Sequence, residues 1–233
     1  LPLMVDFEER LYAAGRIPGG YIKREGRPSE EAVLVGRLVD RPLRPLFDKN
    51  IRNDIQVVVT AMSSDPEVYM DVLAILGASA ALMISDIPFG GPVGAVRVGC
   101  VGDQLIFNPT VSQMAESTLD LRMAGTEDAI LMVEAGAQEV PEELLVRALR
   151  EGHAAIQDSI ATQKRMAEEI GKPKRQMLVR ETDPAAFDEV MARFETRITE
   201  AVRAAESKEA RSQALDALRV EMLEGVEDEA RAK

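Results

Sequence analysis

Tryptophan is absent from this sequence and cysteine occurs once, which excludes internal disulfides and a core built on large aromatic side chains. The single cysteine, Cys100, has no partner for a disulfide, and no second thiolate is present to hold a metal. Aromatic residues make up only 4% of the 233 residues, so the core has to be assembled from Ala, Val, Leu, Ile and Met. Such a core suits helices packed on a sheet. A chain without structural disulfides is expected in a reducing compartment, the cytoplasm.

Long hydrophobic runs are also missing. The longest apolar stretch, residues 72–84, lies between Asp71 and Asp86 and is well short of the ~20 residues that a membrane-spanning helix needs. We therefore expect no contact with a membrane. The sequence has no signal peptide and no initiator Met, and it ends within a helical pattern, so it reads as a fragment of a longer chain.

Strand and helix signals are mixed through residues 1–140. Ser29 is a good helix N-cap with two glutamates after it, and Pro42 predicts the end of that helix near Asp40. Asp65-Pro66 predicts the start of a second helix that reaches residue 85. Strands are expected at residues 1–5, 55–62, 93–101, 105–107, 119–123 and 130–134. Because these elements do not alternate strictly, the fold class is α+β.

The apolar spacing changes to that of a helix from residue 141 onward. One long helix is expected to reach about residue 170 and to close a first domain, residues 1–172. Residues 173–183, which begin with Pro-Lys-Arg, are the expected linker. Residues 184–233 are rich in Ala, Glu and Arg and predict an all-helical second domain.

Positive charge is concentrated near the start of an acidic chain. The whole sequence has 28 Lys and Arg against 40 Asp and Glu, yet residues 10–50 contain nine cations and five anions. Several of these cations surround Tyr21 in a loop rich in Gly and Pro, residues 15–29. Cations hold phosphates and an aromatic ring stacks on a base, so the loop predicts binding of single-stranded nucleic acid.

The same region carries a family resemblance. The sequence closely resembles the bacterial polynucleotide phosphorylase family in segments that occur in the family's order: residues 12–20, 23–30, 37–47, 77–82, 91–95, 108–110 and 124–127. The resemblance implies a ribonuclease-PH-like fold (ribosomal protein S5 domain 2-like) without its opening strands, followed by the family's all-helical domain. It implies part of a homotrimeric ring that degrades single-stranded RNA from the 3′ end with inorganic phosphate, assisted by Mg²⁺. RNA-degradation machinery is an implied partner.

Catalysis is not expected in this portion, because the resemblance places the family's catalytic groups in a second copy of the fold. The phosphate-binding serines of that copy correspond here to Tyr69, Met70 and Asp71, and an aspartate would repel phosphate. Its metal-binding aspartates and nearby lysine correspond to Met114, Asp120 and Arg122. We expect no catalytic and no metal-binding residue here. The implied RNA-binding residues are Tyr21, Lys23, Arg24, Arg27, Arg37, Arg41 and Arg44.

Plainer interpretations remain open for several residues. The loop could be a solvated hairpin, and Arg37, Arg41 or Arg44 could pair within the chain with Asp40. His153, the only histidine, is expected to be a packing or surface residue. At the level of function, the alternatives are a non-catalytic RNA-binding ring subunit and, with less support, a single-copy enzyme that trims tRNA ends.

Overall fold

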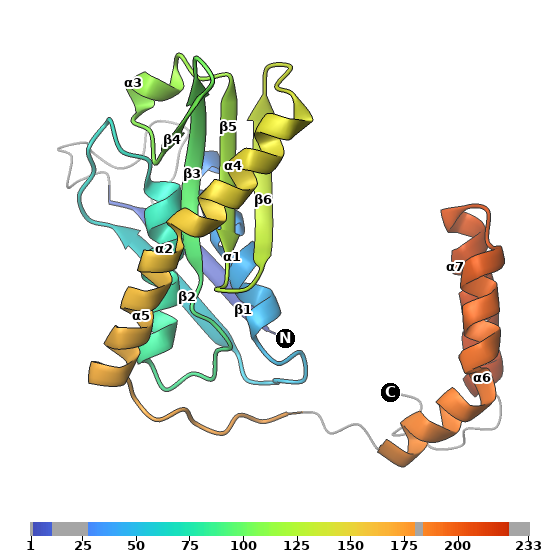
Figure 1. Ribbon diagram of the computed structural model, residues 1–233. Helices are drawn as coiled ribbons and strands as arrows, with labels where there is room; N and C mark the ends of the chain where they lie inside the picture. The colour runs from blue at the N-terminus through green and yellow to red at the C-terminus, as the bar shows by residue number, and fades with distance from the viewer. Residues whose placement is uncertain (1, 11–27, 180–183, 224–233) are drawn as a thin grey trace, which may run out of the picture. The chain divides into compact units, whose positions relative to one another are not determined.

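The computed structural model describes residues 2–10, 28–179 and 184–223 (Figure 1). The chain divides into two compact units, Leu1–Val179 and Arg180–Lys233. The part expected as a linker before residue 180 is thus counted with the first unit.

The described part of the first unit contains two separate sheets. Strands β1 (Leu3–Glu9) and β2 (Ile55–Ala61) form a parallel pair. The second sheet is antiparallel in the order β4-β3-β5-β6 and consists of β3 (Gly94–Val101), β4 (Gln104–Phe107), β5 (Leu119–Gly125) and β6 (Ile130–Ala137). The predicted hairpin of β3 and β4 is confirmed, and its turn residues Gly102 and Asp103 both have positive φ, as a two-residue hairpin turn requires.

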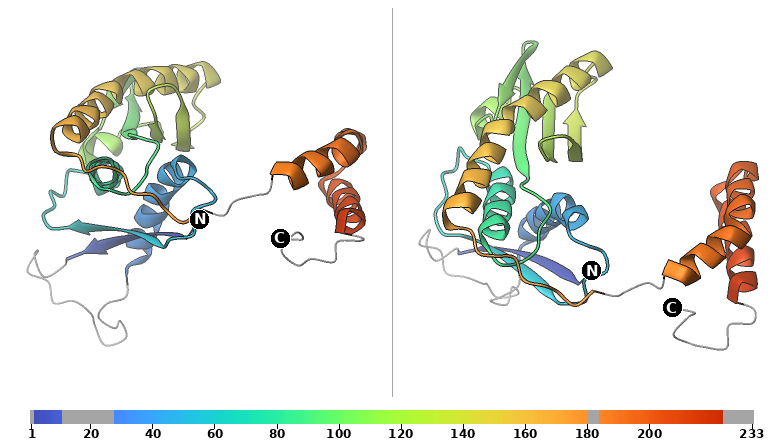
Figure 2. Two further views of the ribbon diagram at one scale, coloured as in Figure 1. Left: turned by 90° about the horizontal axis from the view of Figure 1, so that it is seen from below. Right: turned by 60° about the horizontal axis from the view of Figure 1, so that its bottom comes forward.

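Helices and sheets stack in four layers, as Figure 2 shows. The helices of the first unit are α1 (Glu30–Leu43), α2 (Met70–Ile84), α3 (Val111–Met114), α4 (Glu142–Ala155) and α5 (Gln157–Ile170). Helices α1 and α2 lie between the two sheets, and α4 covers the other face of the four-stranded sheet (Figure 2). The alternation of β5 follows from this, because Leu119, Leu121 and Met123 pack towards α4 while the residues between them face α1 and α2.

The contact between α4 and the sheet is close because of a glycine. A Cβ atom on Gly152 would lie 2.5 Å from the sulfur of Met123, so no larger residue fits at this position without movement. His153, next to it, directs Nε2 to the carbonyl oxygen of Thr126 at 2.9 Å. This bond is consistent with the packing role expected for the only histidine.

Three helix boundaries differ from the sequence prediction. Pro42 lies inside α1, which continues to Leu43, because a proline in the last turn removes only one hydrogen bond. Helix α2 begins at Met70, since Asp65 instead caps a turn by accepting a bond from the amide of Glu67 at 2.9 Å. The expected long helix is broken at Ile156, which separates α4 from α5.

The segment after α5 is bound along the first unit. Lys174 Nζ donates to the carbonyl oxygens of Leu82, Met83 and Ser85 at 2.8–3.0 Å and thereby satisfies the carboxyl end of α2. Burial lowers the pKa of Lys174, and the nearby carboxylate of Asp86 opposes this shift. These contacts explain why residues 173–179 do not behave as a free linker.

A buried polar contact joins α2, α5 and the start of β3. The Ser79 hydroxyl donates to Gln163 Oε1 at 2.6 Å and accepts from the amide of Val93 at 2.8 Å. Gln163 Nε2 donates to the carbonyl oxygen of Val93 at 2.9 Å. The serine of the Gly-Ala-Ser segment therefore has a structural role here, because every polar group of this contact is paired inside the core.

We expect Ser79→Ala to lower the free energy of unfolding by about 1–3 kcal/mol, because it leaves the amide of Val93 and Gln163 Oε1 buried without their partner. Chemical denaturation measures the change. Ser63→Ala, at an exposed position, is the control and should change the stability by less than about 0.5 kcal/mol. Equal effects of the two substitutions would show that the core adapts to the loss.

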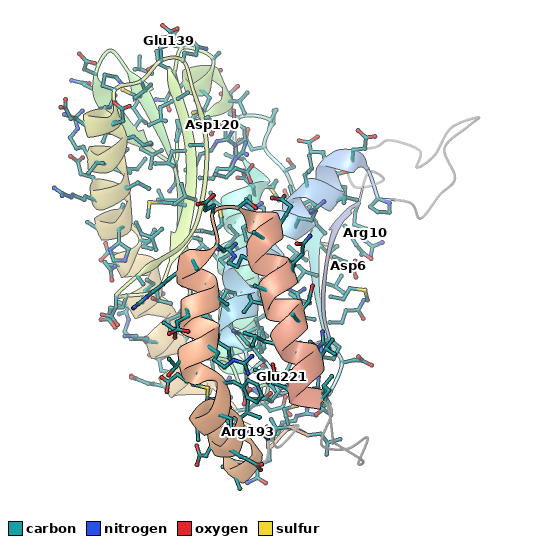
Figure 3. All side chains as sticks on the ribbon, turned by 90° about the vertical axis from the view of Figure 1, so that its right-hand side faces the viewer. Asp6, Arg10, Asp120, Glu139, Arg193 and Glu221 are labelled. Carbon is teal, nitrogen blue, oxygen red and sulfur yellow. The ribbon has the colours of Figure 1, made fainter. Side chains whose placement is uncertain are left out.

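The second unit consists of helices α6 (Pro184–Ala204) and α7 (Lys208–Leu223) in its described part (Figure 3). Arg197 on α6 makes two bonds to Glu221 on α7 at 2.6 and 2.7 Å, which raise the pKa of Arg197 and lower that of Glu221. Phe194 and Leu218 are its buried apolar side chains. In the described parts of both units, no helix is long and apolar enough to span a bilayer.

Candidate functional site

The inner face of the four-stranded sheet, which faces α1 and α2, changes from apolar to charged side chains along its length. At one end the side chains are small or apolar, as at Ala95, Ala124 and Met132. Towards the other end three charged residues lie side by side on adjacent strands. These are Arg97 on β3, its cross-strand neighbour Arg122 on β5, and Glu134 on β6 opposite Arg122.

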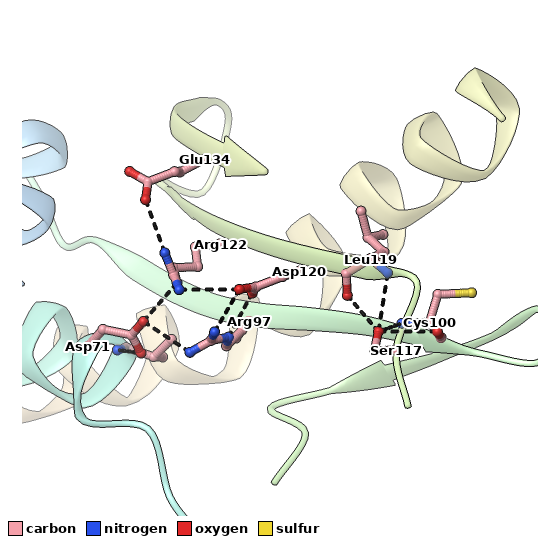
Figure 4. Close-up of polar contacts among 9 residues, drawn as sticks. Asp71, Arg97, Cys100, Ser117, Leu119, Asp120, Arg122 and Glu134 are labelled. Carbon is pink, nitrogen blue, oxygen red and sulfur yellow. Dashed lines mark hydrogen bonds and ion pairs between the residues drawn. The ribbon is translucent and has the colours of Figure 1, made fainter. Parts of the chain in front are cut away.

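The two arginines share two carboxylates (Figure 4). Arg97 binds Asp120 with two hydrogen bonds, Nε to Oδ1 at 2.8 Å and Nη2 to Oδ2 at 2.7 Å. Arg122 Nη2 also reaches Asp120 Oδ2, at 3.2 Å. Asp71, on the first turn of α2, lies with Oδ2 at 3.4 Å from Arg97 Nη1 and 2.9 Å from Arg122 Nε. Each carboxylate thus bridges both guanidinium groups.

The ion network continues to α1. Arg122 Nη1 donates to one carboxylate oxygen of Glu134 at 3.0 Å, and Arg41 Nη1 lies 3.4 Å from the other. We call these six residues the ion network: Arg41, Asp71, Arg97, Asp120, Arg122 and Glu134. It contains three cations and three anions, so its charges balance. Buried charges need this kind of pairing, and only 6% of the Arg97 side chain is exposed.

The aromatic ring of Tyr69 packs against the ion network. The guanidinium carbon of Arg97 lies 3.4 Å from the centre of the Tyr69 ring, the geometry of a cation–π contact. One face of this ring is therefore occupied by the protein and is not free to stack on a base.

A groove of about 1030 Å³ opens above the ion network. It lies where the parallel strands β1 and β2 end, beside α1 and the start of α2, a position where α/β folds commonly bind ligands. Its walls carry exposed apolar side chains, including Leu34, Met62, Val68 and Val111. Its charged lining comprises Arg10, Arg37, Glu9, Glu31 and Asp65, together with every member of the ion network except Asp120. The groove therefore combines apolar walls with a charge-neutral floor.

The three arginines of α1 and the turn that follows it have different surroundings. Arg44 is bound to both carboxylate oxygens of Asp40 at 2.7 and 2.8 Å and to the carbonyl oxygen of Leu3, so it has the structural role that the sequence left open. Arg41 reaches Glu134 over a longer distance and is exposed. Arg37 is exposed on the groove, and no described residue forms a hydrogen bond or an ion pair with it.

The loop residues Tyr21, Lys23, Arg24 and Arg27 lie outside the described residues. Of the positions singled out by resemblance, Tyr69, Asp71, Asp120 and Arg122 come together in the structure. Asp120 has two arginine partners, Arg97 and Arg122. Sequence reasoning missed Arg97. Its signal was a lone cation within the apolar run of β3.

These residues do not fit a divalent metal. The carboxylates of Asp71 and Asp120 face guanidinium groups, which compete with any cation for the same oxygens. Within residues 2–10, 28–179 and 184–223, no group of three or more His, Cys, Asp or Glu side chains is arranged to hold a metal ion.

Comparison with known proteins gives the family context. Residues 1–88 match domain 1 of the 3′ exoribonuclease family, and residues 91–155 match domain 2. The chain is 51% identical over 215 residues to the polyribonucleotide nucleotidyltransferase of Shouchella clausii and 52% identical over 215 residues to that of Geobacillus kaustophilus. Each alignment covers 92% of this chain and 30% of the relative, so the chain spans about a third of the length of these relatives.

A solved structure shares the fold. The crystal structure of rice (Oryza sativa) Rrp46 superposes with a TM-score of 0.56 over 71% of this chain and 72% of that chain, at 13% sequence identity. The expected α+β, ribonuclease-PH-like fold is thus confirmed.

Proposed function

The chain belongs to the 3′ exoribonuclease family, and from this we propose that it is part of a phosphorolytic 3′→5′ exoribonuclease, a polyribonucleotide nucleotidyltransferase. The observation that carries the proposal is about 50% identity to enzymes of that name over nine-tenths of the chain. In this reaction inorganic phosphate attacks the 3′-terminal phosphodiester of RNA and a nucleoside diphosphate leaves. The reverse reaction extends RNA from nucleoside diphosphates.

The role proposed for this portion is to bind single-stranded RNA and to build a homotrimeric ring. Tyr21 would stack on a base, while Lys23, Arg24 and Arg27 would hold phosphates. Arg37 supports this role because it is exposed and unpaired in the described structure, and Arg41 can join it by leaving Glu134. Arg44 is the weakest candidate, since both its partners are internal.

Catalysis is proposed to reside outside these residues, in a second copy of the fold that would bind phosphate and Mg²⁺. Support comes from the ion network, whose carboxylates are all committed to arginines. The unpaired, buried Cys100 supports a cytoplasmic location. An association of the whole protein with RNA-degradation machinery is part of the same proposal.

The ion network also favours a second candidate function, a non-catalytic RNA-binding ring subunit. Such a subunit needs cations on α1 and no free catalytic carboxylate, which matches the described residues. The length of the native reading frame separates the two candidates. A second copy of the fold with a phosphate site, encoded in the same reading frame, would support the exoribonuclease.

The test of RNA binding is Lys23→Ala combined with Arg24→Ala in the full-length protein. Each lost phosphate contact lowers the slope of log affinity against log salt by about 0.7 for a single strand, so we expect weaker binding and a slope reduced by about 1.4. Fluorescence anisotropy with a labelled oligoadenylate over a salt series measures both quantities.

The matched control is Lys49→Ala combined with Lys172→Ala, which removes two cations at exposed positions outside the loop and the groove. Its salt slope should stay near that of the wild type. An unchanged affinity and slope in the Lys23/Arg24 variant would show that the loop is a structural turn.

A further inference from the structure

The carboxyl end of α2 gathers several backbone carbonyl oxygens around one point. The helix ends at Ile84, so the oxygens of its last turn have no amides of a following turn to bind. The carbonyl oxygens of Leu82, Met83 and Ser85 lie at 2.8, 3.0 and 2.8 Å from Lys174 Nζ. We call these three oxygens the α2 cradle. The negative end of the helix dipole lies at the same place, so the cradle favours a cation.

The group in the α2 cradle is an ammonium ion. Nζ makes three hydrogen bonds to oxygen atoms, and only the protonated form of a lysine has three N–H donors. The carbonyl oxygens thus take the place of water around the charge. Lys174 lies 89 to 92 residues further along the chain than the oxygens that it binds. The cradle therefore belongs to α2, and its occupant comes from a distant segment.

The spacing of the α2 cradle selects the kind of cation. Oxygen ligands lie about 2.3–2.6 Å from Ca²⁺ and about 2.0–2.1 Å from Mg²⁺, whereas a charged N–H donor lies about 2.7–2.9 Å from oxygen. The observed 2.8–3.0 Å fits ammonium. It also suits potassium, which proteins bind through backbone carbonyl oxygens. The nearby carboxylate of Asp86 is paired with Arg175, so a divalent ion would have to compete for it.

We propose that the α2 cradle is a binding site for a compact monovalent cation, ammonium or potassium, which the chain fills with the ammonium group of Lys174. A free cation of this class takes the site when residues 172–175 leave it. This inference does not depend on RNA binding or on catalysis by the whole protein, because the site lies in the first unit and uses only backbone oxygens of α2 and the residue after it.

The occupant of the α2 cradle also holds the segment that leads to the second unit. On either side of Lys174, the amide of Lys172 donates to the carbonyl oxygen of Ile84 at 3.0 Å, and that of Arg175 to the carbonyl oxygen of Asp86 at 2.8 Å. These bonds form only while the segment lies against α2. The cation in the cradle therefore helps to fix where the chain leaves the first unit.

The test is Lys174→Ala in the full-length protein, with hydrogen exchange of the last turn of α2 measured by mass spectrometry. The substitution leaves three carbonyl oxygens without their charged donor, so we expect these amides to exchange about tenfold faster than in the wild type in tetramethylammonium chloride. Potassium or ammonium chloride at equal ionic strength should restore most of the protection. Magnesium chloride should not, because Mg²⁺ keeps its waters and demands shorter distances.

Lys172→Ala is the matched control, because it removes an exposed lysine of the same segment whose side chain does not enter the α2 cradle. This variant and the wild type should show the same exchange in all four salts, since Lys174 fills the cradle in both. The proposal is wrong if Lys174→Ala exchanges no faster than the wild type in tetramethylammonium chloride. It is also wrong if potassium and ammonium protect Lys174→Ala no better than magnesium does, or protect Lys172→Ala equally.

Discussion

Arg97→Met will lower the free energy of unfolding of the first unit by about 3–5 kcal/mol, because it removes one partner from a buried ion network. The methionine fills most of the space of the arginine stem, so the loss is mainly electrostatic. Asp120 would lose its two shortest hydrogen bonds and Asp71 one of its two cations. The Tyr69 ring would also lose the guanidinium stacked on it.

Urea denaturation followed by circular dichroism measures this change. Arg150→Met is the control, since Arg150 is exposed on α4 and no described residue pairs with it; its effect should stay within about 0.5 kcal/mol. A loss below about 1 kcal/mol for Arg97→Met would mean that water entering from the groove solvates the two carboxylates.

Phe194→Ala will unfold the second unit while leaving the first unit folded. Replacing a buried phenylalanine costs about 3–5 kcal/mol, and a unit of two helices has little stability to lose. Among the described apolar side chains of this unit only Phe194 and Leu218 are buried. The two units form separate compact bodies, so the loss should remain within the second.

Hydrogen exchange followed by mass spectrometry tests this prediction by measuring the protection of backbone amides in each segment of the chain. Protection should disappear in α6 and α7 and persist in β3 and β5. Phe187→Ala offers a control of the same chemistry on the same helix, because that side chain is 62% exposed and its loss should leave protection almost unchanged. Full protection of α6 in the Phe194 variant would show that other contacts hold α6 and α7 together.

Secondary structure was predicted correctly from the sequence where it depends on interactions between residues that are close in the chain. The β3–β4 hairpin was predictable because Gly102-Asp103 suits a tight turn between two apolar runs. The start of α1 was predictable because Ser29 accepts a bond from the amide of Ala32 at 3.0 Å, which is a contact within one turn. The strand pattern of β5 was predictable from its alternation of apolar and polar residues.

The predicted helix boundaries were wrong where the same residues can form two different local structures. Asp65-Pro66 can cap either a helix or a turn, and the structure uses the turn. Pro42 can end a helix or lie in its last turn, and here α1 continues past it because Leu43 packs in the core. Such choices depend on burial of the neighbouring residues, which a window of a few residues does not contain.

The sequence alone established the mixed fold class, the clustering of cations near residues 10–50 and the family to which the motifs belong. The tertiary structure established the ion network, because residues 71, 97 and 134 meet only through the register of β3, β5 and β6 and the packing of α2 on the sheet. It also distinguished the arginines of α1 and the following turn: Arg37 has no partner among the described residues, whereas Arg44 binds Asp40 and the carbonyl oxygen of Leu3. The physical reason is the separation of the interacting groups along the chain. Turn preferences and the spacing of apolar residues depend on neighbours in sequence, whereas ion pairs form between groups that only folding brings within a few ångströms of each other.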